Sequence, residues 1–122
     1  MASRQGFSRG DKIRKAMMRE ISDIIAHEIK EPVLNNQIIS VTDVVPSPDN
    51  RHARVYVSIL GDESKRAEIM EVLKEAQPKI RMHVGQRIRL RYTPEIEIRY
   101  DDSIERGSRV TDLLNQISRG EV

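Results

Sequence analysis

The sequence predicts an α+β protein of two layers, in which helices cover one face of a small three-stranded sheet. Apolar residues recur at helical spacing in several segments, whereas residues 52–60 alternate between apolar and polar, as a strand with one buried face does. The segments run as helix, strand, strand, helix, bent helix and strand, with one more helix at the end, and such a mixed set packs in two layers. The 122 residues suffice for a single domain with one core, and we expect residues 1–8 and 119–122 to be flexible.

The first half of the chain predicts a long helix followed by a β-hairpin. Asp11 can cap the helix, and Pro32 ends it because a proline disfavours helical geometry in the residue before it. Residues 38–45 and 52–60 then form two strands, joined by the turn residues 46–50. The helix buries one apolar stripe, which consists of Ile13, Met17, Ile21, Ile24, Ile25 and Ile29.

A break between two helices is predicted further along the chain. Asp62 can cap the second helix. Pro78 lacks an amide hydrogen and clashes with the preceding turn, so this helix cannot continue through it, yet proline suits the first turn of a new helix. We therefore predict a third helix from Pro78 to about Gln86, at an angle to the second, and expect Gln77 to leave helical geometry. Three residues of this region face inward: Ile80, Val84 and Ile88.

A strand and a last helix are predicted after the third helix. Residues 90–100 are strand-like, and Pro94 among them favours an edge strand or a bulge. The last helix is expected to start near Ser103, with Asp102 and Ser103 as capping residues. Asp101 and Asp102 are adjacent carboxylates, and a compact nuclease that used them would need further convergent groups. Capping is therefore the preferred interpretation of this pair.

The most informative feature for function is a run of positive charge at residues 79–91. The whole chain is near balance, with 21 Lys and Arg against 19 Asp and Glu, but this run contains no acidic residue. Several fixed cations favour a nucleic-acid backbone, because each neutralised phosphate releases condensed counterions. The alternative is an ordinary solvated face. The RNA-binding candidates in the run are Lys79, Arg81, His83, Arg87, Arg89 and Arg91.

A second basic group lies on the first helix. Lys12, Lys15 and Arg19 are three and four residues apart, so they share one helix face. This face is a plain solvent face if it stands alone, and an RNA-binding surface if it adjoins the third helix. Arg54, on the polar side of the hairpin, is a further candidate for RNA contact. Tyr56 beside it either stacks on a base or fills the sheet surface.

Composition excludes several classes of protein. The chain has no Cys, which excludes disulfides and cysteine-rich zinc sites, and its three histidines have no metal-ligand spacing. Only four aromatic residues are present, so base-stacking platforms are poorly supported. No apolar run has the length of a membrane helix, and the N-terminus has no signal-peptide core. We expect a monomeric cytoplasmic protein without cofactor, metal or membrane partner.

A set of motifs in order along the chain indicates one family. The set consists of residues 14–30 followed by Glu31-Pro32, residues 53–61, Ile80-Arg81, Gly85, residues 89–91, residues 94–96 and residues 100–103. From about residue 10 to about residue 118 the sequence resembles the bacterial ribosome-binding factor A family. The resemblance implies a type II KH-like fold and a non-enzymatic assembly factor. Such factors bind the immature small ribosomal subunit and its ribosomal RNA, assist late maturation and are associated with growth in the cold.

The resemblance also directs attention to the break between the second and third helices. Ordinary KH domains grip a nucleic-acid backbone with a Gly-x-x-Gly loop, which this chain lacks. The family has an Ala-x-Gly kink instead, and the corresponding residues here are Ala76, Gln77 and Pro78, with proline in place of glycine. We expect a more rigid kink that lays the third helix along a phosphate track. The competing hypothesis is a small adaptor whose charged helices bind an acidic protein without touching RNA.

Overall fold

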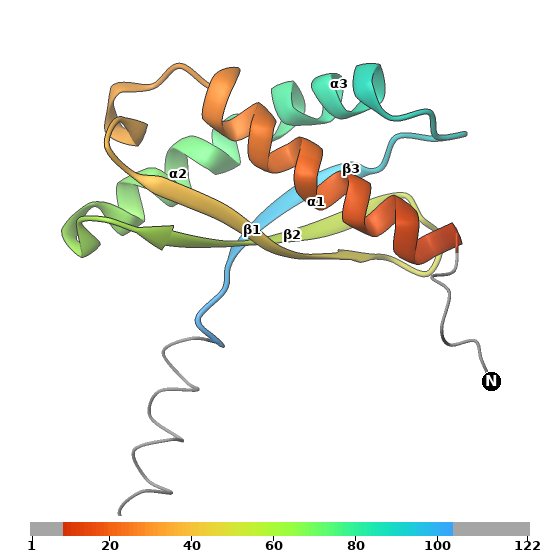
Figure 1. Ribbon diagram of the computed structural model, residues 1–122, viewed down its shortest axis with the longest axis horizontal. Helices are drawn as coiled ribbons and strands as arrows, with labels where there is room; N and C mark the ends of the chain where they lie inside the picture. The colour runs from red at the N-terminus through yellow and green to blue at the C-terminus, as the bar shows by residue number, and fades with distance from the viewer. Residues whose placement is uncertain (1–8, 104–122) are drawn as a thin grey trace, which may run out of the picture.

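The computed structural model describes residues 9–103. The helices are α1 (Arg9–His27), α2 (Arg66–Glu75) and α3 (Gln77–Arg87), and the strands are β1 (Ile38–Pro46), β2 (His52–Leu60) and β3 (Glu95–Tyr100). The sheet has the order β1-β2-β3, with β1 and β2 antiparallel and β2 and β3 parallel. The helices pack against one side of this sheet (Figure 1), so the predicted α+β architecture is confirmed.

A single apolar core joins the two layers. In β2, Ala53, Val55 and Val57 are at most 1% exposed while Arg54 between them is exposed, which confirms the predicted alternation. No polar side chain is buried anywhere in residues 9–103. The helices, β1 and β3 supply the other fully buried side chains, namely Ile21, Ile24, Val44, Ile69, Leu73, Ile80, Val84 and Ile98. The stripes inferred from helical spacing are therefore the faces that pack on the sheet.

Two element boundaries differ from the prediction. The helix α1 begins at Arg9 rather than at Asp11, which lies in its first turn. The strand β3 spans Glu95–Tyr100 rather than residues 90–100, and the buried Pro94 lies just before it. Proline cannot donate a hydrogen bond to a neighbouring strand, so the ladder starts only after it. β3 lies at the edge of the sheet, as Pro94 indicated.

The predicted capping role of Asp62 also needs correction. Asp62 caps a single 3-10 turn, Glu63–Lys65, by accepting a hydrogen bond from the Ser64 amide, and α2 starts only after this turn. The Ser103 amide donates a hydrogen bond to the Asp101 carboxylate at 2.8 Å, while capping of the last helix by Asp102 and Ser103 stays a prediction. An aspartate reaches the amide two residues ahead of it more readily than the adjacent one. The predicted C-terminal helix after Ser103 lies outside the described residues.

The helix break is present, and it lies at Ala76. This residue has φ −84° and ψ −2°, and it ends α2 and begins α3. A continuous helix would bring the Pro78 ring against the carbonyl group of Lys74, four residues earlier, so the chain opens before the proline. We expected Gln77 to leave helical geometry, but Gln77 is the first residue of α3. The break lies one residue earlier, at Ala76.

The kink is tied to the sheet by Gln77. Its Oε1 atom accepts a hydrogen bond from the Ile98 amide of β3 at 2.8 Å. An edge strand carries amide groups that no neighbouring strand can bind. Gln77 satisfies one of these groups and thereby fixes the start of α3 over the middle of β3.

Replacing Gln77 by leucine should lower the free energy of unfolding by about 1–3 kcal/mol, because the Ile98 amide loses its acceptor in a partly buried place. Urea denaturation measures this difference. Gln77→Glu is the matched control, since it keeps an acceptor at the same reach and should retain most of the stability. Equal stability of the leucine variant and the original protein would show that this hydrogen bond contributes nothing.

Candidate nucleic-acid interface

Three segments that are distant in sequence meet at one end of the molecule (Figure 1). They are the first turns of α1, the turn between β1 and β2, and the α3–β3 connection, residues 88–94. Together they surround a cavity of about 730 Å³. We call this part the basic end and define it by its exposed cations, Lys12, Lys15, Arg51, Arg89 and Arg91.

The structure brings the two predicted basic groups together at this end. The first turns of α1 and the α3–β3 connection line the same cavity, so these two segments are neighbours. The first segment carries Lys12 and Lys15, and the second carries Arg89 and Arg91. Within residues 9–103, Lys12, Arg89 and Arg91 form no ion pair. The charge of these side chains is therefore available to an external anion.

Four of the remaining candidates lie elsewhere. Lys79 is exposed at the start of α3, next to the kink. Arg19 is 73% exposed on α1 and lies 3.6 Å from Glu20. Arg54 is 54% exposed on β2, with its Nε atom 3.5 Å from the Glu97 carboxylate. Arg19 and Arg54 flank the basic end without being part of it, whereas Lys79 lies at the other end of α3 from the α3–β3 connection. The fourth, Arg81, is partly buried.

Arg87 has a different environment from the one its sequence neighbours suggested. Its guanidinium lies 2.7 Å from Asp23, 3.2 Å from Glu20 and 3.4 Å from Glu28, and the side chain is only 25% exposed. His83, one turn earlier on α3, is 16% exposed and lies 3.9 Å from Glu28. The run at residues 79–91 contains no acid, but α1 supplies three. The predicted phosphate track along Lys79, His83 and Arg87 is thus not a free cationic surface, and two of its members hold α3 against α1.

This cluster makes the stability depend on pH. The hydrogen bond from Arg87 lowers the pKa of Asp23 below its ordinary value of 3.8, and the bond to Asp23 raises the pKa of Arg87. An acid whose pKa is lower in the folded chain contributes stability above its unfolded pKa and loses it as the pH falls. The contribution of Asp23 is therefore complete at neutral pH and disappears in acid.

The melting temperature should stay nearly level from about pH 7 to about pH 5 and fall below about pH 4. Arg87→Met should melt lower than the original protein at neutral pH, because three carboxylates lose their cation. Other carboxylates also titrate in acid, so the informative quantity is the difference between the two melting curves. This difference should shrink between about pH 5 and about pH 3. A constant difference would contradict the assignment of the cluster.

Arg81 has a structural role that the sequence did not indicate. Its Nε and Nη2 atoms donate hydrogen bonds to the Thr93 carbonyl group at 3.1 and 2.8 Å. Gly85, one turn later, lets Thr93 approach closely, because a Cβ atom there would lie 3.1 Å from the Thr93 hydroxyl. Arg81 and Gly85, one helical turn apart, thus keep the α3–β3 connection close to α3. A glycine inside a helix was the one available signal, since it weakens a helix and often marks a close approach.

Two residues at the basic end, Arg51 and Tyr92, were not among the predicted site residues. Tyr92 is 44% exposed, and the guanidinium carbons of Arg51 and Arg81 lie 5.2 and 5.5 Å from its ring centroid. Both distances are in the range of cation–π contacts. Arg51 belongs to the hairpin turn and Arg81 to α3, so the grouping exists only in the folded chain.

Of the two adjacent carboxylates near the end of β3, Asp101 has both oxygens hydrogen-bonded. Asp101 accepts a hydrogen bond from the Thr42 hydroxyl at 2.6 Å as well as the one from the Ser103 amide. This geometry agrees with a capping role. In residues 9–103 no three His, Asp or Glu side chains are grouped so as to hold a metal ion. Over the same residues, none of the helices has both the length and the hydrophobicity to cross a membrane.

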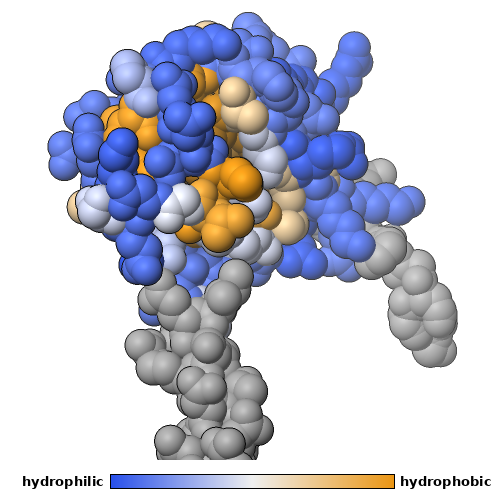
Figure 2. Space-filling model, turned by 60° about the vertical axis from the view of Figure 1, so that its left-hand side comes forward, coloured by the Kyte–Doolittle hydropathy of each residue, from blue (hydrophilic) through white to orange (hydrophobic). Residues whose placement is uncertain are grey.

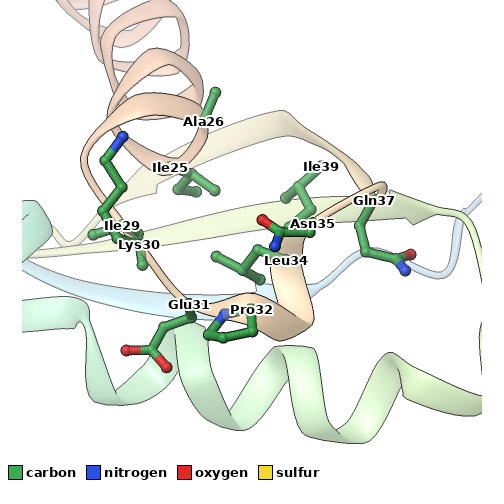
Figure 3. A pocket seen from close by; sticks show the side chains of 10 residues that line it. All are labelled: Ile25, Ala26, Ile29, Lys30, Glu31, Pro32, Leu34, Asn35, Gln37 and Ile39. Atoms are coloured by element: carbon green, nitrogen blue, oxygen red, sulfur yellow. The ribbon is translucent and has the colours of Figure 1, made fainter.

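A second hollow, of about 430 Å³, lies at the opposite end of α1. Ile25, Leu34 and Ile39 gather in it, and Lys30 is the one cation among its lining residues (Figure 3). Ile38 and Leu60, paired across β1 and β2, are 61% and 69% exposed in the same region. Figure 2, which turns this part of the molecule forward, shows apolar surface framed by hydrophilic residues. The two ends of the molecule therefore differ in chemistry, and the basic end is the one that suits an anion.

Comparison with known proteins decides the family. The family model described as Ribosome-binding factor A matches residues 9–114. The chain belongs to this family. A Ribosome-binding factor A of Halothermothrix orenii is 47% identical over 113 residues, which cover 93% of this chain and 91% of the relative. One from Acetivibrio thermocellus is 47% identical over 108 residues, covering 88% and 87%.

Solved structures of the family share the fold. The crystal structure of ribosome-binding factor A from Thermus thermophilus has a TM-score of 0.62 at 21% identity, covering 73% of this chain and 91% of that one. The solution structure of a putative ribosome binding factor A from Thermotoga maritima has a TM-score of 0.63 at 26% identity, covering 77% and 91%. A homology model of the Thermus factor, fitted into the cryo-EM map of its 30S complex, has a TM-score of 0.59 at 21% identity, with 73% and 91% coverage.

Proposed function

We propose that this protein is a non-enzymatic ribosome biogenesis factor with a type II KH-like fold. It binds the immature small ribosomal subunit, contacts the ribosomal RNA and assists late maturation. Membership of the Ribosome-binding factor A family supports the partner, as does the fit of a related factor into the map of a 30S complex. The basic end supports RNA as the component that is touched.

The observation that carries the RNA contact is the set of cations without partners at the basic end. Lys12, Arg89 and Arg91 come from two adjacent segments and have no ion pair within the described part of the chain. Each cation that neutralises a phosphate releases counterions from the RNA, and this release is the main sequence-independent source of affinity. Lys15, Arg19 and Arg54 extend the surface, Lys79 is a separate candidate at the start of α3, and His83 and Arg87 are held by acids of the α1 region.

Sedimentation with ribosomal particles tests this function. The protein should travel with free small subunits and not with complete ribosomes, and the affinity should fall steeply between low and moderate salt. About five phosphate contacts give a log–log slope of about −4.5 on a duplex and about −3.5 on single strands. A flat salt response would contradict the RNA contact and favour the adaptor hypothesis. Cells depleted of the protein should accumulate unprocessed small-subunit RNA if it assists maturation.

A further inference from the structure

The cavity at the basic end combines an apolar floor with a cationic rim. Met17, Val44 and Ala53, which contribute to the floor, are at most 4% exposed. Arg51 and Arg91 are exposed at the rim. Its volume of about 730 Å³ lies in the range of sites that hold small ligands. An occupant that matches both parts has a flat apolar portion and an anionic portion.

Tyr92 gives this cavity an aromatic wall that is already in position. The neighbouring Thr93 is held by Arg81, whose side chain also lies 5.5 Å from the Tyr92 ring. Gly85 allows this part of the connection to sit close to α3. The wall therefore does not have to be ordered when a ligand arrives, which saves the entropy that a mobile loop would lose.

The charges at the rim favour an anion. Arg14 is occupied by Asp43, at 2.7 Å, and does not contribute a free charge. Asp49, the acidic lining residue, accepts hydrogen bonds from the Ser47 hydroxyl at 2.7 Å and the Arg51 amide at 3.0 Å within the hairpin turn. These bonds lower the pKa of Asp49, so it carries a negative charge that offsets one of the lining's three arginines and leaves the lining with a net positive charge. Two cations of the lining have no ion pair among the described residues: Arg51, whose guanidinium carbon lies 5.2 Å from the Tyr92 ring centroid, and Arg91.

We propose that this cavity binds one unpaired nucleotide of the RNA. The base lies against Tyr92 and the apolar floor, and the adjoining phosphate lies between Arg51 and Arg91. Single-stranded RNA is commonly recognised in this way, through a base on an aromatic ring and cations along the backbone. One aromatic side chain is enough for one base, so the small number of aromatic residues is no obstacle. The inference rests on the proposed function and adds to it a preference for unpaired RNA.

Binding to short RNA probes tests the cavity. The probes are a single strand with 2-aminopurine at one position and a duplex of the same sequence. The original protein should prefer the single strand, and the fluorescence of the 2-aminopurine should drop on binding because the base stacks. Tyr92→Leu should weaken binding to the single strand about tenfold and leave duplex binding and the salt slope unchanged. Tyr92→Phe is the matched control, because it keeps the ring and should bind like the original.

The outcomes separate this proposal from the proposed function. Unchanged binding of Tyr92→Leu, with affinity still sensitive to salt, would overturn the nucleotide site and leave the RNA-binding function intact. An absence of binding to any RNA, with a flat salt response on small subunits, would remove both.

The chain's own N-terminal residues are the competing occupant, because Gly10 lines the cavity and Phe7 is three residues earlier. If they fill it, Phe7→Ala lowers the melting temperature and the 2-aminopurine signal of the original protein does not change. That result would also overturn the proposal. The fluorescence readout needs no substitution, so it holds whether or not a variant folds.

Discussion

Reversing two exposed arginines, Arg89→Glu together with Arg91→Glu, is expected to weaken binding to small ribosomal subunits about 100-fold or more at low salt. Hydrogen bonds to charged groups are worth about 1.5–3 kcal/mol each, and two of them are lost. Each added glutamate also repels the phosphates. The log–log salt slope should become shallower by roughly 2, because two fewer counterions are released. Sedimentation or filter binding at several salt concentrations measures both quantities.

The matched control reverses two cations at the opposite end of the molecule, Lys30→Glu together with Lys65→Glu. Lys30 lines the hollow at the far end of α1, and Lys65 ends the 3-10 turn before α2. The net charge changes by the same amount, so a loss that depends only on overall charge would appear in both double variants. Both should keep their melting temperature, since exposed substitutions change stability by about 0.5 kcal/mol or less. Equal weakening of the two variants would contradict an interface at the basic end.

Arg87 is unsuitable for charge reversal because it forms ion pairs with three acids of the α1 region. Arg87→Glu would place a fourth carboxylate among Asp23, Glu20 and Glu28, and the packing of α3 on α1 would suffer. A loss of RNA binding by that variant would then report on folding rather than on contact. Arg89 and Arg91 have no such partners among the residues described.

Local patterns in the sequence were sufficient to predict most of the helices, strands and buried faces. The alternation of β2 and the stripe of α1 depend on residues a few positions apart, and both are buried as expected. The break near Pro78 also follows from one residue's covalent geometry, and only its place was wrong by one position. The start of β3 was misplaced because periodicity alone cannot tell an extended connection from a hydrogen-bonded strand.

The candidate site was harder to predict because it depends on residues far apart in the chain. The acids that surround Arg87 lie 59 to 67 residues before it. A run free of acids in the sequence is therefore not free of acids in space. Arg81 was predicted to contact RNA, and nothing in the sequence indicated its hydrogen bonds to the Thr93 carbonyl group, 12 residues later. Tyr92 was counted only as a scarce aromatic, because nothing near it in sequence indicates Arg51.

Stability should be most sensitive to the packing of α3, and Ile80→Ala tests this. Ile80 is fully buried one turn after the kink at Ala76, in the helix that packs against both α1 and β3. Removing three carbons from such a site costs about 2–5 kcal/mol, through lost burial and the cavity left behind. That is a large part of the roughly 5–15 kcal/mol that stabilises a typical domain. Urea and thermal denaturation should both show the loss.

Met82→Ala is the control for this substitution, because Met82 is on the same helix but 51% exposed. It should cost about half as much or less, since about half of Met82 already contacts water. If Ile80→Ala cost less than about 1 kcal/mol, α3 would not be held by its apolar face, contrary to the packing described above. RNA affinity should fall in the Ile80 variant as well, although no charge changes. Arg81, which carries the α3–β3 connection, is the next residue on the helix, so a loosened α3 displaces Arg89 and Arg91 together with their support.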